Sequence, residues 1–92
     1  MAVTVRLPGA LRDATGGATK VQASAGTLAE ILADLDLRHP GLRARILDDA
    51  GRIRTYVNVY IGEDDARTHG GTSAHVPDGS EVMVIPAMAG GA

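Results

Sequence analysis

The sequence predicts an α+β fold in which one main helix packs across a mixed sheet of four or five strands. Three observations lead to this fold class. Residues 2–7 and 55–61 alternate between apolar and polar side chains, as half-buried strands do. Between them, residues 27–35 carry apolar side chains at helical spacing. Residues 82–85 are apolar on both faces of a strand, which suits the middle of a sheet or a strand whose outer face meets a partner.

The first two strands are expected to form a hairpin. Residues 2–7 place three apolar side chains on one side, and Pro8-Gly9 ends the strand. Gly16-Gly17 marks a turn before the second strand, which is predicted over residues 19–23. The connection between the two strands is expected to be long and loose, with Leu11 inside it.

The main helix has a clear start and a clear end. Thr27 is the predicted N-cap, and Glu30 three residues later completes a capping box. His39-Pro40-Gly41 ends the helix, and residues 42–47 suggest a further short helical turn. The stripe that faces the sheet consists of Leu28, Ile31, Leu32 and Leu35.

The second half of the chain supplies the remaining strands. In the strand over residues 55–61, Val57, Val59 and Ile61 are expected to point inward, and Tyr56, Asn58 and Tyr60 outward.

A turn at residues 63–65 follows, and Ala66-Arg67 is expected to begin a short edge strand. Pro77-Asp78-Gly79 predicts another turn before the last strand, residues 81–85. The first and last strands are expected to lie side by side in the centre, because both are apolar and lack edge protection.

Composition excludes several classes of function. The chain has 92 residues, so it forms one domain, and 9 Lys and Arg against 11 Asp and Glu give a net charge of −2. That balance, with only two aromatic residues, argues against nucleic-acid binding. There is no Cys, which excludes a disulfide, an iron–sulfur cluster and a thiolate nucleophile. No signal peptide or membrane-spanning run is apparent, so a cytoplasmic protein that does not bind membranes is expected.

No group of side chains predicts an active site of the chain's own. His39, His69 and His75 lie in loop-like surroundings without metal-ligand spacing, so no metal site is expected. The adjacent carboxylates at 48–49 and 64–65 are expected to be solvated turns. The arginines at positions 43, 45, 52 and 54 could form a small basic patch, but a solvated surface is the simpler interpretation.

A Gly-Gly pair near the end of the sequence is the most specific feature. Gly16-Gly17 and Gly70-Gly71 lie between structured segments and need no role beyond turns, whereas Gly90-Gly91 lies beyond the last strand. A Gly-Gly backbone carries no side chains, so it is narrow enough to pass through a tight channel in another protein. The apolar side chains that lead into it, on the side opposite Val82 and Val84, are Met83, Ile85 and Met88. They suit docking, although burial of both strand faces remains an alternative.

These features together resemble the MoaD/ThiS family of ubiquitin-like sulfur carriers. The resemblance covers nearly the whole chain: an N-terminal Val-Thr-Val strand, the helix start at residues 27–32, and Tyr-Val-Asn-Val-Tyr at 56–60. It continues through Asp65, Arg67 and the turn at 78–79. Its most specific part is the ending Pro-Ala-Met-Ala-Gly-Gly at residues 86–91.

The resemblance implies a β-grasp, ubiquitin-like domain over residues 1–86 and a flexible tail over residues 87–92. It implies a carrier rather than an enzyme, with no bound cofactor. A ubiquitin-activating-type enzyme would use ATP to adenylate Gly91, and a sulfur donor would convert the acyl-adenylate to a thiocarboxylate. Gly90 and Ala89 would give the tail its narrow profile. The residues that would contact partners are Met83, Ile85, Met88, Tyr56 and Tyr60.

Within the family, the chain looks most like the actinobacterial carriers of cysteine biosynthesis, whose sulfur acceptor is a cysteine synthase. The small subunit of molybdopterin synthase, which inserts its tail into the large subunit, is the next alternative. A ubiquitin-like binding module with an inactive tail, or a modifier conjugated to lysines, also remains open.

Ala92 departs from the family pattern, because carriers act through a terminal Gly. The Gly91 carboxylate is in a peptide bond here and cannot be adenylated. A trimming metalloprotease could remove Ala92, Ala92 could be an addition to the natural protein, or the protein is not a carrier. Removal of Ala92 before activation is the hypothesis taken forward.

Overall fold

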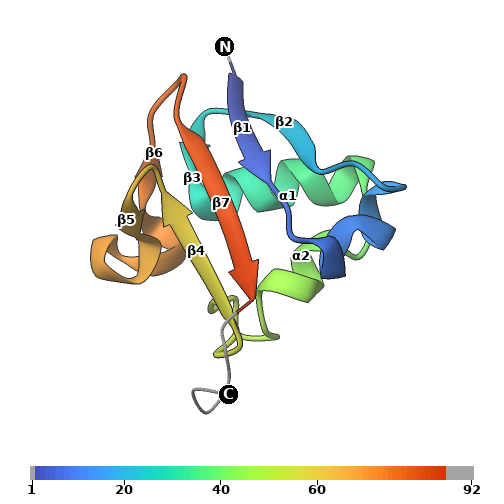
Figure 1. Cartoon of the computed structure of the whole chain (residues 1–92). Coiled ribbons are helices and arrows are strands. Elements are labelled where there is room, and N and C mark those ends of the chain that lie inside the picture. The colour runs from blue at the N-terminus through green and yellow to red at the C-terminus, as the bar shows by residue number, and fades with distance from the viewer. Residues whose placement is uncertain (1, 87–92) are drawn as a thin grey trace.

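A five-stranded mixed sheet forms the centre of the fold, in the order β2-β1-β7-β4-β5 (Figure 1). The computed structural model describes residues 2–86. The strands are β1 (Ala2–Arg6), β2 (Lys20–Ser24), β4 (Val57–Ile61), β5 (Asp64–Asp65) and β7 (Glu81–Pro86). β1 runs parallel to β7, and the other neighbours are antiparallel. The predicted central position of the first and last strands is therefore confirmed.

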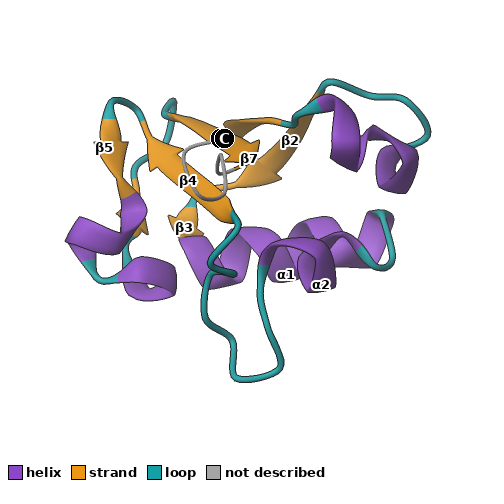
Figure 2. Ribbon diagram, turned by 60° about the horizontal axis from the view of Figure 1, so that its bottom comes forward, coloured by secondary structure: helices purple, strands orange, loops and turns teal. Residues whose placement is uncertain are grey.

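Two helices cover one face of this sheet (Figure 2). α1 (Leu28–Arg38) and α2 (Leu42–Ile46) bury the predicted apolar stripe of α1 against the inward side chains of the strands. The core is aliphatic, and Val3, Val5, Val59 and Val82 are fully buried in it. In residues 2–86, no helix is long and apolar enough to span a membrane.

The capping box predicted at the start of α1 is present. The Glu30 backbone N–H donates to Thr27 Oγ1 at 3.2 Å, and the Thr27 N–H donates to Glu30 Oε1 at 2.9 Å. The hydrogen bond from the Thr27 backbone, with one from its hydroxyl, lowers the pKa of Glu30 below its ordinary value. These contacts satisfy two N–H groups that have no partner inside the helix.

Thr27→Ala is expected to lower the free energy of unfolding by about 1 kcal/mol. Because the pKa of Glu30 is lowered in the folded state, the carboxylate stabilises the fold above its ordinary pKa. That contribution is lost as the pH falls through the lowered value. Urea unfolding at neutral and acid pH measures both effects. Glu30→Gln should remove this part of the pH dependence, and an unchanged acid profile would contradict the assignment.

Three local expectations were wrong. The connection after β1 is not loose: it forms the 3₁₀ helix η1 (Gly9–Thr15), which buries Leu11 and Thr15. The Thr15 hydroxyl lies within hydrogen-bond distance of the carbonyls of Arg12 (3.1 Å) and Ala18 (2.9 Å), and its one proton, donated to either, closes the segment. Ordered local hydrogen bonds of this kind leave no apolar periodicity in the sequence.

The edge strand lies earlier than predicted. β5 comprises Asp64–Asp65, while Ala66 begins the 3₁₀ helix η2 (Ala66–His69). The Asp65 side chain accepts a hydrogen bond from the Arg67 N–H at 2.9 Å, which caps η2 and turns the chain out of the sheet. A further 3₁₀ helix, η3 (Gly71–Ser73), follows.

β4 begins at Val57 rather than at Thr55. The Val57 N–H donates to the Arg54 carbonyl at 3.0 Å, so residues 54–57 form a turn instead of extending the strand. A two-stranded ladder of β3 (Gly26–Thr27) and β6 (His75–Val76) was not predicted. Two-residue strands are too short to show alternation.

Candidate functional site

The face of the sheet opposite α1 and α2, here called the outer face, holds three of the predicted docking side chains, Met83, Ile85 and Tyr60. Val82 and Val84 point into the core, whereas Met83 and Ile85 alternate with them and are half-buried on the outer face. Met83 lies between Arg6 of β1 and Tyr60 of β4, and Ile85 lies beside Asn58. The structure therefore brings Met83, Ile85 and Tyr60 together.

Two hollows border Pro86, the last residue of β7. The first, called the outer hollow, has a volume of about 250 Å³ and is lined by Arg6, Leu7, Pro8 and the four residues 83–86. The second, called the edge hollow, has a volume of about 140 Å³ and lies between η1 and the start of β4. Its lining includes Pro8, Leu11, Arg45, Tyr56, Val57 and Pro86. Both hollows are mainly apolar, and both lie where the chain leaves the sheet toward Gly91.

Tyr56 belongs to the edge hollow and not to the predicted strand face. It lies in the turn before β4, so it does not share a strand face with Tyr60. Tyr56 is 55% exposed, and it is one of the two large hydrophobic residues that are clearly exposed among the described residues. The Arg54 guanidinium lies over it, 6.0 Å from the ring centroid. The expectation that both tyrosines line one face is corrected by this turn.

Arg67 holds the Tyr56 turn in place. Its guanidinium donates to the carbonyls of Arg54 and Val57, both at 2.7 Å, and to Asn58 Oδ1 at 3.0 Å. Val57 in turn pairs with Pro86 in the β4–β7 ladder. One planar side chain thus connects η2 to the turn that flanks the end of β7. The fixed fork of donors on Arg suits this task, and a Lys ammonium cannot span the same three acceptors.

Arg67→Lys is expected to lower the free energy of unfolding by about 1–2 kcal/mol, because at least one carbonyl loses a charge-assisted hydrogen bond. The effect should be concentrated in residues 54–58, where hydrogen exchange of the Val57 amide should become faster. Amide exchange measured by NMR tests this directly. If the 54–58 amides exchange as in the unmodified chain, Arg67 does not position this turn.

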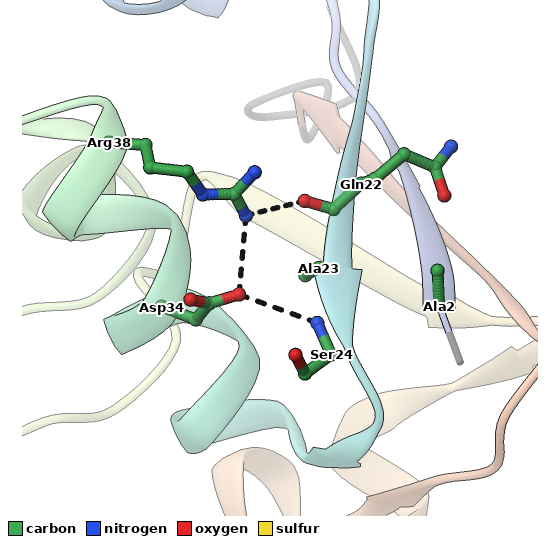
Figure 3. Close-up of a pocket in the computed structure, with 6 residues that line it drawn as sticks. All are labelled: Ala2, Gln22, Ala23, Ser24, Asp34 and Arg38. Carbon is green, nitrogen blue, oxygen red and sulfur yellow. Dashed lines mark hydrogen bonds and ion pairs between the residues drawn. The ribbon is translucent and has the colours of Figure 1, made fainter.

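A pocket between β2 and α1 has a structural role (Figure 3). Arg38 forms an ion pair with Asp34 at 3.2 Å and donates to the Gln22 carbonyl, and the Ser24 N–H donates to Asp34 at 3.4 Å. Figure 3 shows these groups pointing toward one another across the gap. Both charged side chains are used to attach α1 to β2. Ala2 begins β1, which is parallel to β7, so this pocket lies away from Pro86.

The histidines and paired carboxylates do not form a metal centre in the part of the chain that the structure describes. His69 Nε2 lies 3.5 Å from Asp64 Oδ2 at an exposed site. Both residues line a surface pocket that His75 also lines. Over residues 2–86, no three His, Cys, Asp or Glu side chains are placed to hold a metal ion. The Arg52 backbone N–H donates to Asp48, and this bond lowers the pKa of Asp48.

Three of the four arginines of the possible basic patch have separate side-chain partners. Arg45 pairs with Asp13, Arg52 pairs with Asp48, and Arg54 donates to the Ala44 carbonyl. Arg43, Arg45, Arg52 and Arg54 therefore act mainly as surface and structural side chains.

The remaining predicted site residues, Met88, Ala89, Gly90, Gly91 and Ala92, lie outside the described residues. Apart from Tyr56, the sequence-based prediction also missed the residues of the edge hollow, because Pro8 and Leu11 approach β7 only through the fold. Arg67 was noted without a role. Its position two residues after the Asp65 cap was the available signal.

The comparisons with known proteins agree with this fold and with the family resemblance. The sequence model of the ThiS family matches residues 5–91. The sulfur carrier protein CysO of Mycobacterium tuberculosis is 39% identical over 93 residues, which cover 99% of this chain and all of CysO. Small archaeal modifier protein 3 of Haloferax volcanii is 31% identical over 65 residues, covering 71% of this chain and 70% of that protein.

Solved structures confirm the predicted β-grasp fold. In the crystal structure of the Amycolatopsis orientalis BexX/CysO complex, the matching chain is 40% identical, with a TM-score of 0.90. The match covers 97% of this chain and 99% of that one. Crystalline SAMP1 from Haloferax volcanii has a TM-score of 0.77 at 22% identity, covering 98% and 99%, and shares the fold. The relatives are named as carriers and modifiers rather than as enzymes.

Proposed function

The chain belongs to the ThiS family, and we propose that it is a sulfur carrier that acts through a thiocarboxylate on Gly91. The observation that most supports this function is the similarity to CysO, a sulfur carrier protein, along 99% of the chain. The family match also extends to Gly91, one residue before Ala92. The chain contributes the acyl group, and its partners contribute the catalysis.

The chemistry needs two steps at one carbon. The free Gly91 carboxylate attacks the α-phosphorus of ATP, which forms an acyl-adenylate and releases pyrophosphate. Sulfide then attacks the carbonyl carbon, AMP leaves with the electron pair of the C–O bond, and the thiocarboxylate remains on Gly91. Adenylation replaces a poor leaving group with a good one, and the absence of a Cβ on Gly leaves the carbonyl open to attack. Because the enzyme consumes ATP, this proposal places activation in the cytoplasm.

The outer face supplies the docking surface in this proposal. Met83, Ile85 and Tyr60 form a half-buried apolar group at the centre of the sheet, next to the strand end that leads to Gly91. Tyr56 adds an exposed ring beside Pro86. Exposed apolar side chains of this kind mark protein-binding surfaces. The relative CysO from Amycolatopsis orientalis is known in complex with BexX, so binding to a second protein occurs in the family.

Ala92 makes the 92-residue chain a precursor in this scheme. A metalloprotease is proposed to remove Ala92 and free the Gly91 carboxylate. Three chains test the proposal: residues 1–92, residues 1–91, and residues 1–89. Each is incubated with the adenylating enzyme of the same organism, ATP and sulfide, and intact mass is measured.

The 1–91 chain is expected to gain the mass difference between sulfur and oxygen. The 1–92 chain should gain it only after the protease has removed Ala92, and the 1–89 chain should gain none. Sulfur on a chain that still holds Ala92, or no sulfur on the 1–91 chain, would contradict the proposal.

The proposed acceptor is an O-phosphoserine-dependent cysteine synthase, because the carrier relatives with high identity are CysO proteins. Thiocarboxylated 1–91 chain should then yield cysteine with that enzyme. Transfer only to the large subunit of molybdopterin synthase would assign the chain to molybdopterin synthesis instead.

The similarity to a small archaeal modifier protein supports a second role, conjugation to lysines. Isopeptide-linked Gly-Gly remnants on cellular proteins, found by mass spectrometry, would reveal it.

A further inference from the structure

Cationic side chains surround the end of the sheet from which the chain continues to Gly91. A third hollow, of about 280 Å³, adjoins the outer hollow through Arg6 and Leu7, and Arg12 and Lys20 also line it. Arg45 lines the edge hollow on the other side of Pro86. No Asp or Glu lines any of these three hollows, although the whole chain carries a net charge of −2. The charge of the molecule is therefore unevenly distributed.

Two of these four cations are paired within the fold. Arg6 contacts Glu81 at 2.8 Å, and Arg45 contacts Asp13 at 3.3 Å. Arg12 and Lys20 are exposed and take part in none of the ion pairs found among residues 2–86. They are the two cations at this end that a partner can still neutralise.

The strand register adds a second observation. Arg6 and Lys20 are direct partners in the β1–β2 ladder, so two positive side chains lie side by side on the outer face. Like charges directly opposite each other destabilise a sheet. Met83 lies on the other side of Arg6, which places the positive pair directly beside the apolar docking group. Glu81 already pairs with Arg6, so a partner's carboxylate beside Lys20 would supply the second negative charge at this point, next to Met83.

The length of the tail limits where a partner can sit. Gly91 is five residues beyond Pro86, so even a fully extended tail reaches only about 17 Å. An enzyme that acts on Gly91 must therefore place its reaction centre within that distance of Pro86. A globular enzyme so close has to cover the surface around the end of β7, which includes the outer and edge hollows, and the third hollow adjoins the outer hollow.

We propose that the adenylating enzyme presents an acidic surface to Arg12 and Lys20, next to an apolar surface that covers Met83 and Ile85. This inference rests on the proposed function and specifies the partner's surface. Ion pairs between this acidic surface and Arg12 and Lys20 orient the sheet so that Gly91 can enter the reaction centre. Contacts of this kind act mainly on the rate and register of association, and they weaken as salt is added.

Charge reversal tests the proposal with the 1–91 chain and the adenylating enzyme of the same organism. Arg12→Glu and Lys20→Glu are each expected to raise KM for the carrier about tenfold while kcat changes less than about twofold. Arg12→Gln and Lys20→Gln should give smaller increases. KM of the unmodified chain should rise with NaCl, and this dependence should flatten in both charge-reversal variants. Arg43→Glu is the matched control, because it makes the same change in net charge at an exposed position on α2, within the helix layer.

Several results would overturn the inference. Equal KM values for all variants, a KM without salt dependence, or an equal effect of Arg43→Glu would exclude a specific acidic surface. Binding of inorganic phosphate to the Arg12–Lys20 hollow at physiological salt, seen as NMR shifts of these residues, would assign the hollow to a small anion instead. These outcomes leave the proposed function intact, since the unmodified chain still gains sulfur. Failure of the unmodified 1–91 chain to be adenylated would reject both proposals.

Discussion

Met83→Asp is expected to lower kcat/KM for adenylation of the 1–91 chain about 100-fold, or about 3 kcal/mol. Met83 occupies the middle of the outer face, between Arg6 and Tyr60, in the strand that leads to Gly91. The substitution removes the apolar side chain at the centre of the surface that the partner covers, and the new carboxylate would lose its water shell there even with Arg6 beside it, which is costly. The fold should tolerate the change, because Met83 is only half-buried.

Ala2→Asp is the control for that experiment. It adds the same charge to the exposed side of β1, at the end of the sheet away from Pro86. This variant should be adenylated like the unmodified chain, and urea unfolding should confirm that both variants are folded. If Met83→Asp is adenylated normally, or if Ala2→Asp is equally impaired, the outer face near Pro86 is not the docking surface.

Leu35→Ala is expected to lower the free energy of unfolding by about 3 kcal/mol. Leu35 is fully buried between α1 and the sheet, so its truncation removes apolar burial and leaves a cavity in the core. Domains of this size have about 5–10 kcal/mol of stability in total, so a large share would be lost. Urea unfolding followed by circular dichroism measures the change.

Leu37→Ala is the matched control on the same helix. Leu37 is 83% exposed, and its truncation should change the free energy of unfolding by less than about 0.5 kcal/mol. A similar loss for both variants would mean that α1 does not pack through the face that contains Leu35. Leu37→Ala should also leave adenylation unchanged, because α1 lies on the other side of the sheet from the outer face.

The fold could be predicted where one face of an element is buried and the other is not. Alternation in residues 2–7 and the stripe of α1 result from burial of one side, and both elements were placed correctly. The capping box was also predictable, because its hydrogen bonds join residues three apart. η1, η2 and the turn before β4 depend instead on individual hydrogen bonds, such as those of Thr15 and Asp65, which leave no periodic signal.

The site could be predicted only along β7. Alternation in residues 82–85 separates Met83 and Ile85 from the core side chains, and the structure confirms their position. The hollows around Pro86 combine residues from η1, β1, α2 and the start of β4. Their meeting depends on the strand order and the parallel β1–β7 pair, so the cations at positions 12 and 20 could not be associated with the tail from the sequence. Arg67 acts mainly through the backbone carbonyls of Arg54 and Val57, so the sequence signal at Asp65 indicates its position but not these partners.

The most direct measurement of the central claim is the intact mass of this protein recovered from the organism that makes it. The proposed function predicts a chain that ends at Gly91, with a fraction of molecules carrying one sulfur in place of a carboxylate oxygen. Alkylation of the sulfur and tandem mass spectrometry would place it on Gly91. A chain that keeps Ala92 and carries no sulfur while the acceptor enzyme is active would contradict the account.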